Sequence, residues 1–277
     1  MTDTTSNPIL ILGGTGKTGR RLAERLTAHG TPVRIGSRSG SPRFDWEVPA
    51  TWGPAMQGVS AVYISYYPDI AVPGAAEVVE AFARLAMANG VTRLVLLSGR
   101  GETEAQRAEE MLKASGADWT ILRCAWFSQN FSEGFLVESV LEGEVALPVS
   151  NVGEPFVDAD DIAEAAFVVL TEPGHVGQLY ELTGPRLLSF ADAVAEIGKA
   201  AGRDVRFVRI SHDEFTAAVA AHELPPEFAW LLNELFTEVL DGRNETLTDG
   251  VQRVLGRAPK DFSAYANETA ATGIWSK

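Results

Sequence analysis

Three glycines near the start of the chain have the spacing of a phosphate-binding turn. Gly13, Gly16 and Gly19 match the pattern GxxGxxG, and they lie between an apolar run at 9–12 and an amphipathic helix expected at 17–29. The first glycine permits a sharp turn, the second lets the backbone approach a pyrophosphate, and the third lets the helix pack close to the sheet. The helix N-terminus offers N–H groups and a partial positive charge to the anion. An ordinary strand-to-helix turn could use the same residues, but the flanking elements favour a dinucleotide site.

The same stretch contains the end of a triphosphate-binding loop, Gly16-Lys17-Thr18. The full motif, GxxxxGK[ST], requires a glycine five positions before Gly16, where Ile11 stands inside the apolar run. The triphosphate loop therefore lacks most of its length, and the dinucleotide interpretation is the one that fits.

The end of the second expected strand, "PVRIGSRSG", bears on the choice of cofactor. A site for NAD normally places an acid there to bind the ribose hydroxyls, but no acid occurs before Asp45. Ser37, Arg38 and Ser39 stand at that place instead. An arginine can bind a 2′-phosphate through a bidentate contact, so we expect NADP(H) rather than NAD, with a solvated surface arginine as the alternative. Arg34 alternates with apolar neighbours and is expected to point outward from the strand.

Apolar runs alternate with helical patterns through the first two-thirds of the chain. This alternation predicts an α/β fold, a Rossmann-type doubly wound parallel sheet. The segment 41–58 is expected to hold a short strand near Phe44 and a helix that starts near Thr51. The other expected strands are Ile9–Leu12, Val33–Ser37, Val59–Ser65, Arg93–Ser98 and Trp119–Arg123, and the other helices lie at about 17–29, 74–89 and 102–115.

The pattern loosens after Arg123. Residues 125–140 look helical, "EVALPV" looks like a short strand, and "DADDIAEAAFVVLT" looks like a helix with Asp158 as its N-cap. "QLYELTG" predicts a strand, 189–201 a helix, and "VRFVRI" a strand followed by several helices. We therefore expect a Rossmann domain at 1–183 and a smaller, mostly helical C-terminal lobe at 184–277, to which 125–155 contributes.

The chain has an ordinary globular composition and a strong negative charge. Of its 277 residues, 45% are hydrophobic and 22% are charged, and the net charge is −14. Nucleic acid and anionic membrane surfaces would be repelled, so we expect neither as a partner. The start of the chain, Met1–Pro8, has no apolar stretch of a signal peptide, and no run is long enough to cross a bilayer, which predicts a cytoplasmic protein. The oligomeric state is left open.

Neither the cysteine nor the histidines predict a metal or redox site. Cys124 is the single cysteine, and its place in the run "WTILRCAWF" predicts a buried, inert thiol. The histidines show no ligand spacing, so we expect no metal. They are His29, His175, His212 and His222.

Several runs together resemble a known family. These are "ILGGTGKTG", "IGSRSG", "GVTRLVLLSGRGE", "SGADWTILRCAWFSQNF" and "EPFVDADDIAEAA". Residues 8–200 resemble an NmrA-like protein, an atypical short-chain dehydrogenase/reductase. The run "RFDWEVPATWGPAMQGVSAVYISYYPD" resembles the branch that includes ergot-alkaloid reductases of the festuclavine and agroclavine type and their bacterial relatives. The resemblance implies a Rossmann core with a small substrate lobe, NADP(H) as ligand, and either reductase activity or nucleotide sensing.

The resemblance also implies positions for the site residues. The pyrophosphate would lie at Gly13, Thr15, Gly16, Lys17 and Thr18, and the adenosine phosphate at Ser37 and Arg38. Tyr66 and Tyr67 would lie along the cofactor, and the nicotinamide would be bordered by Ser98 and Gly99 and by Cys124, Ala125 and Trp126. A flat aromatic or cyclic small-molecule substrate would contact Tyr67, Trp126, Phe127 and Asn130. The aromatic residues among these, together with Tyr66, form either a substrate wall or ordinary core packing.

Three functions are compatible with the glycine loop: a reductase, an NADP(H)-sensing protein that binds a partner protein without chemistry, and a sugar-nucleotide epimerase. Epimerases and dehydrogenases of this superfamily use a Tyr-x-x-x-Lys pair for proton transfer, and the corresponding positions here look like Gly101 and Ala105. Epimerisation is therefore excluded, while the reductase and the sensor remain.

The missing acid also restricts the substrates of a reductase. Reduction of a simple ketone builds an alkoxide and needs a proton donor, whereas an iminium ion needs none and a quinone can take protons from water. We expect pre-activated electrophiles as substrates, with Ser98 able to donate a hydrogen bond to a carbonyl oxygen. On this interpretation Ser98→Ala slows quinone turnover modestly.

Overall fold

The chain divides into two compact units. The computed structural model describes residues 7–221 and 225–276. His222 and the first six residues of the segment Met1–Pro8, which is predicted to be no signal peptide, lie outside the described residues. The first unit comprises the chain up to Gly99 together with Thr103–Arg123 and Ile162–Tyr180. The second comprises Arg100–Glu102, Cys124–Asp161 and Glu181–Lys277.

A parallel sheet of six strands organises the first unit, in the order β2-β1-β3-β4-β5-β7. Its strands are β1 Ile9–Leu12, β2 Val33–Gly36, β3 Ala61–Ile64, β4 Arg93–Gly99, β5 Asp118–Cys124 and β7 Gln178–Leu182, the last two of which run on into the second unit. Ile9 of β1 lies opposite Val33 on one side and Ala61 on the other. The chain order therefore reverses between β1 and β3, which is where open α/β sheets bind ligands at the carboxyl ends of their strands.

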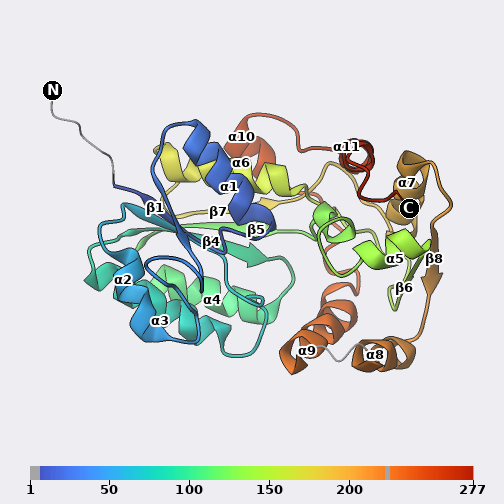
Figure 1. Ribbon diagram of the computed structural model, residues 1–277, viewed down its shortest axis with the longest axis horizontal. Helices are drawn as coiled ribbons and strands as arrows, with labels where there is room; N and C mark the ends of the chain where they lie inside the picture. Colours follow the sequence, from blue (N-terminus) through green and yellow to red (C-terminus); the bar gives the residue numbers. More distant parts are fainter. Residues whose placement is uncertain (1–6, 222–224, 277) are drawn as a thin grey trace. The chain divides into compact units, whose positions relative to one another are not determined.

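Helices cover both faces of this sheet. Figure 1 shows α2 Trp52–Met56, α3 Ala75–Ala88 and α4 Thr103–Ala114 on one face, and α1 Lys17–Ala28 and α6 Ala159–Thr171 on the other. Apolar residues at helical spacing, such as Leu22 and Leu26 of α1, are fully buried. The doubly wound Rossmann-type class predicted from the alternation of runs is confirmed.

The segment around Phe44 differs from its prediction, because no strand forms there. A short 3-10 turn at Pro49–Thr51 precedes α2, and the residues before it form turns. The Phe44 amide donates to the Ser37 carbonyl over 2.9 Å, which closes a loop between β2 and α2. The Phe44 ring is 3% exposed and packs edge-on against Trp46 and Phe82, so hydrophobic packing holds this loop.

The second unit contains a small parallel sheet of β6 Glu144–Leu147 and β8 Arg206–Arg209. Its helices among the described residues are α5 Val137–Glu142, α7 Phe190–Ala201, α8 His212–Ala221, α9 Pro226–Glu234, α10 Gly250–Leu255 and α11 Phe262–Ala271, with a π-helical turn at Leu235–Val239. α7 begins with a capping box between Ser189 and Asp192. The predicted strands and the helical character of this part are confirmed.

The helix predicted over 125–140 is wrong. The structure has a 3-10 turn at Ser128–Phe131, a further break, and then the short α5. The buried residues Trp126, Phe131 and Leu136 recur every five positions, a spacing that one face of an α-helix cannot present. The chain before the turn is extended instead, with the Val157 amide donating to the Trp126 carbonyl over 2.9 Å.

Candidate functional site

The glycine loop of the first unit follows β1 at the switch point of the sheet. Gly13 adopts φ +69°, a left-handed conformation that favours glycine, and its carbonyl accepts the Gly16 amide over 2.9 Å. Gly16 is the N-cap of α1, with extended backbone. No side chain caps this helix and no acid occupies its first turn, so the helix N-terminus is suited to an anion.

Gly19 has the packing role that its position in the pattern predicts. A Cβ atom there would lie 2.3 Å from the Gly13 carbonyl oxygen, so any side chain would force α1 away from the loop. At Gly16 the same atom would lie 3.2 Å from that oxygen, a contact that a small shift relieves. The loop therefore fits a pyrophosphate cradle in which Gly19 is structural and Gly16 is left to face a ligand.

The three residues other than glycine between Gly14 and Gly19 differ in exposure. Thr15 is exposed and Lys17 is half-buried, as a phosphate-binding role requires. Thr18 is 4% exposed, and its hydroxyl oxygen accepts a hydrogen bond from the Tyr63 hydroxyl over 3.0 Å. The Thr18 side chain is thus packed against Tyr63, and the predicted place of Thr18 at the pyrophosphate stays a prediction.

Lys17 also acts on a half-buried acid, Asp69, in the loop after β3. Burial raises the pKa of Asp69, while the Ala71 amide, which donates to its Oδ1 over 2.9 Å, and the positive charge of Lys17 offset part of that rise. The positive charge of Lys17 would therefore interact both with Asp69 and with an anion bound beside it.

Arg38 follows β2 on the surface of the first unit. Ser37 is half-buried, its carbonyl accepts from Gly40 and Phe44, and the Arg38 side chain is exposed. The guanidinium carbon of Arg38 lies 5.2 Å from the centre of the Tyr67 ring, a cation–π contact. Asp45, the first acid after the strand, instead accepts a hydrogen bond from Arg43 over 2.6 Å. The charge of Arg38 also helps to lower the pKa of Asp45, and no other acid occurs in the sequence between β2 and Asp45.

Tyr66 and Tyr67 follow β3 and have different surroundings. The Tyr66 ring lies 4.9 Å from Trp46, and burial raises the pKa of its hydroxyl. Tyr67 is 54% exposed and faces Arg38. Of the two, Tyr67 is therefore the one whose ring remains accessible to a ligand. Arg34 points outward as expected and donates to the carbonyls of Ala55 and Gln57 at the end of α2.

Ser98 does not have the free hydroxyl expected of a substrate donor. It is 3% exposed, and its hydroxyl donates to Glu109 Oε1 over 2.6 Å. Glu109 is fully buried and also accepts from Arg123. A hydroxyl has one hydrogen to donate, and here Ser98 donates it to Glu109, so the role at a substrate carbonyl stays a prediction that would require this hydrogen bond to break. Gly99, beside it, is half-buried.

The residues predicted to border the nicotinamide after β5 lie in the second unit. Cys124 is buried and forms no disulfide among the described residues, and burial together with the negative charge of Glu102 holds the pKa of its thiol well above the usual value. This is an inert thiol. The Ala125 amide donates to the Leu182 carbonyl over 3.0 Å, which fixes the backbone at the end of the strand.

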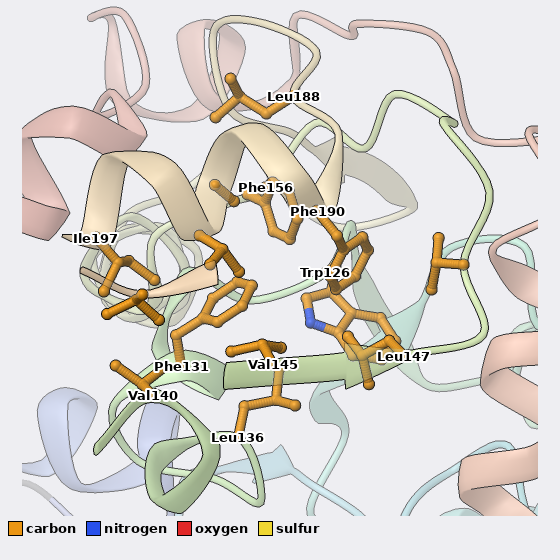
Figure 2. Close-up of a cluster of buried hydrophobic side chains, with 14 of the residues drawn as sticks. Trp126, Phe131, Leu136, Val140, Val145, Leu147, Phe156, Leu188, Phe190 and Ile197 are labelled. Carbon is orange, nitrogen blue, oxygen red and sulfur yellow. The ribbon is translucent and has the colours of Figure 1, made fainter. Parts of the chain in front are cut away.

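Trp126 packs within the core of the second unit. Its ring lies 5.6 Å from Phe190 and 5.4 Å from Phe236, and Figure 2 shows it among the side chains of that core. Within the described part of the chain its buried indole N–H has no hydrogen-bond partner. For Trp126 the packing alternative is thus the one that the structure favours. The other two predicted substrate residues, Phe127 and Asn130, are half-buried.

Glu154 is a notable acid that the sequence reasoning missed. It is 3% exposed, and its Oε1 accepts the backbone amide of Trp126 over 3.0 Å. Burial raises the pKa of Glu154 to about 7, against the opposing effects of that hydrogen bond and of the Arg100 charge. No motif singles out Glu154, because its burial arises from pairing with Leu188, more than thirty positions away.

Gly101 and Ala105, which are expected to correspond to the missing Tyr-x-x-x-Lys pair, both disfavour a larger side chain. Gly101 adopts φ +80°, and a Cβ there would lie 2.7 Å from the side-chain nitrogen of Asn244. Ala105 lies in α4 and is fully buried. Among the described residues, 7–221 and 225–276, no group of three His, Cys, Asp or Glu side chains could hold a metal ion. Over the same residues, no helix is long and apolar enough to cross a membrane.

Comparison with known proteins agrees with this geometry. The family model described as NAD(P)H-binding matches residues 13–173, which include the glycine loop and the first unit's helices. The chain belongs to this NAD(P)H-binding family, as an NmrA-like atypical short-chain dehydrogenase/reductase. This match supports a nicotinamide cofactor as the ligand of the chain.

Relatives of this NmrA-like chain match it over nearly its whole length. An uncharacterised oxidoreductase of Bacillus subtilis, YesF, is 34% identical, with 98% of this chain and 99% of that protein covered. A festuclavine dehydrogenase of Aspergillus fumigatus is 32% identical, and the match covers 95% of this chain and 98% of that protein. The structure of an NADPH-dependent quinone oxidoreductase of Escherichia coli has the same fold, with a TM-score of 0.78 and 24% sequence identity. The match covers 94% of this chain and 99% of that chain.

Proposed function

We propose that this protein is an NADPH-dependent reductase that delivers hydride to a small, planar, pre-activated electrophile of the quinone or iminium type. The glycine loop and the exposed Arg38 would hold the cofactor, whose reduced nicotinamide supplies the hydride when bound. Tyr67, with its exposed ring, would lie along it.

The observation that carries the restriction to pre-activated substrates is the backbone at Gly101. Glycine stands where the tyrosine is expected, so the chain lacks the proton donor that ketone reduction uses in related dehydrogenases, and the left-handed φ and the Asn244 side chain disfavour a larger residue there. Ser98 cannot replace it, because its hydroxyl donates to Glu109. The Escherichia coli structure is named for a quinone, which supports quinones as one class of acceptor.

The cofactor preference rests on Arg38 and on the absence of an acid between β2 and Asp45. A charge-assisted, bidentate contact with the 2′-phosphate is what distinguishes NADPH from NADH at such a position. The cation–π contact with Tyr67 would keep the guanidinium near that place before the cofactor arrives.

The test is to follow the loss of nicotinamide absorbance when the purified protein is incubated with NADPH and one member of each class: a quinone, a cyclic iminium ion and an aliphatic ketone. We expect turnover of the first two and none of the ketone. Efficient reduction of the ketone would overturn the substrate assignment. Tight binding of NADPH with no turnover of any electrophile would instead support the sensor, which is the alternative that the sequence leaves open.

A further inference from the structure

Arg38 leaves the sheet of the first unit at the same edge as the glycine loop. Gly36, the last residue of β2, lies opposite Leu12, the last residue of β1, so Arg38 and Gly13 follow neighbouring parallel strands at their carboxyl ends. Tyr67 follows β3, which pairs with β1 on its other side, and the Tyr67 ring centre lies 5.2 Å from the Arg38 guanidinium carbon. The first unit by itself therefore brings the glycine loop, Arg38 and Tyr67 to one edge of the sheet.

The loop that carries Arg38 leads into a buried acid, Asp45. The Phe44 amide donates to the Ser37 carbonyl over 2.9 Å, which brings the residue after Phe44 back toward the end of β2. The Asp45 carbonyl accepts the Trp52 indole N–H over 2.8 Å, and the Asp45 side chain is 9% exposed. Asp45 is thus held in place, near enough to Arg38 for the two charges to interact.

An ionised carboxylate at this place would weaken a phosphate site at Arg38. It would attract the Arg38 guanidinium and repel a 2′-phosphate bound there, and at low ionic strength both effects extend over several ångströms. Asp45 is ionised at neutral pH, because its pKa lies below the usual value. The Arg43 hydrogen bond lowers this pKa most, burial opposes it, and the Glu47 amide and the charges of Arg43 and Arg38 lower it further. A phosphate site at Arg38 therefore requires that the charge of Asp45 be neutralised.

Arg43 supplies the cation that neutralises Asp45. Its Nη2 donates to Asp45 Oδ2 over 2.6 Å, while the Glu47 amide donates to Oδ1 over 3.2 Å, so each carboxylate oxygen has a donor of its own. From 37 to 45 the sequence carries two arginines and one acid. Because Arg43 and Asp45 form a neutral pair, the net charge of this segment is that of Arg38, whose guanidinium faces the Tyr67 ring.

We propose that Arg43 determines cofactor specificity without touching the cofactor: it neutralises Asp45 and so leaves the charge of Arg38 available to the 2′-phosphate of NADPH. This role rests on the NADPH preference proposed above, and it makes Arg43 a positioning residue. The Arg43 side chain is 54% exposed, but to bind the phosphate itself it would have to release Asp45. That release would leave a buried carboxylate unpaired near a second anion, which is unfavourable.

The test measures the binding of NADPH and of NADH by calorimetric titration at low ionic strength, without any substrate. We expect Arg43→Ala to weaken NADPH binding about fivefold and NADH binding hardly at all, because only NADPH carries the 2′-phosphate. Arg43→Ala combined with Asp45→Asn, which removes the acid as well, should restore NADPH affinity, and Arg43→Lys, which keeps the positive charge, should retain it. Arg84→Ala, which removes an exposed ion pair with Glu80 on α3, is the matched control and should change neither affinity.

Asp45→Asn alone separates the effect of charge from support of the loop. The asparagine oxygen can still accept the Glu47 amide, so NADPH affinity should not fall if the charge of Asp45 is what matters. A fall in this variant would reveal a structural role of the pair, and equal losses in Arg43→Ala and the double variant would reveal a direct contact of Arg43 with the phosphate; either result, or an unchanged NADPH affinity in Arg43→Ala, overturns the proposal. Equal affinities of the unmodified protein for the two cofactors would overturn the NADPH preference itself, which the first titration decides before any variant is compared.

Discussion

The Ser98 hydroxyl donates a hydrogen bond to Oε1 of Glu109 over 2.6 Å. Arg123 binds the same carboxylate from β5, so one buried acid of α4 ties together two neighbouring strands. Glu109 has no exposed surface, and the Arg123 side chain is 18% exposed. This network links β4, β5 and α4, and it uses the one hydrogen of the Ser98 hydroxyl.

Ser98→Ala is therefore expected to reduce stability rather than catalysis. Loss of a hydrogen bond to a charged group costs about 1.5–3 kcal/mol, and Glu109 keeps its contact with Arg123. Thermal unfolding should shift to lower temperature while quinone and iminium rates stay unchanged. A selective slowing of quinone turnover with unchanged stability would restore the role that the sequence alone predicts for Ser98.

The contrast between the glycine loop and Ser98 shows what the sequence can predict. Gly13 and Gly19 act through contacts within a few positions, so their spacing is enough to identify the turn. The partner of Ser98 lies eleven positions away on a helix, and its ion pair comes from a different strand. Because such contacts depend on tertiary packing, the pattern of residue types predicts the loop and not the network.

The second unit illustrates the same limit for secondary structure and for Glu154. The apolar residues at 126, 131 and 136 suggest a helix by composition. Their spacing of five positions does not fit one face of an α-helix, and the structure has a short 3-10 turn in this segment. Glu154 is one of 37 acidic residues in the sequence, and only the pairing with Leu188 reveals that it is buried. The sheet of the first unit, by contrast, follows from apolar runs that are long and regularly spaced.

Arg38→Ala should remove the preference for NADPH over NADH. A charge-assisted contact with the 2′-phosphate contributes about 1.5–3 kcal/mol, or roughly one to two orders of magnitude in affinity. Calorimetric titration should show this loss for NADPH and no change for NADH, which has no 2′-phosphate. Equal affinities of the two cofactors for the unmodified protein would contradict the assignment of Arg38.

Gly16→Val should abolish cofactor binding in a protein that remains folded. The N-cap backbone is extended, which valine adopts readily, and its Cβ contact with Gly13 can relax, but the side chain would occupy the place of the pyrophosphate. Gly19→Val is the matched comparison and should unfold or strongly destabilise the first unit, because its Cβ would lie 2.3 Å from a carbonyl oxygen. Circular dichroism and calorimetry separate the two effects. Retained NADPH affinity in Gly16→Val would contradict the cradle.

Asp261 should make the stability of the second unit dependent on acid pH. Arg186 donates to both of its carboxylate oxygens, over 2.7 and 2.9 Å, and the Ser263 amide adds a third hydrogen bond at the start of α11. The Arg186 hydrogen bonds hold the pKa of Asp261 well below its usual value. The stabilisation is complete above the unfolded-state pKa of about 4 and is lost as the pH falls below it. The unfolding temperatures of Asp261→Asn and the unmodified protein should therefore differ at neutral pH and converge in acid.

Gly101→Tyr, combined with Ala105→Lys, tests whether the missing proton donor can be installed. A left-handed φ costs a residue with a Cβ about 1–2 kcal/mol, and at Gly101 the added atom also meets the Asn244 side chain, which donates to the Arg100 carbonyl. Ala105 is fully buried, so a lysine there would bring an unpaired charge into the core. Gly116→Tyr is the matched control, because Gly116 has φ +81° and no atom within 4 Å of the added Cβ. We expect the double variant to be less stable than the Gly116 variant and to reduce no aliphatic ketone. A stable double variant that reduces such a ketone would mean that the backbone at Gly101 does not restrict this protein to pre-activated electrophiles.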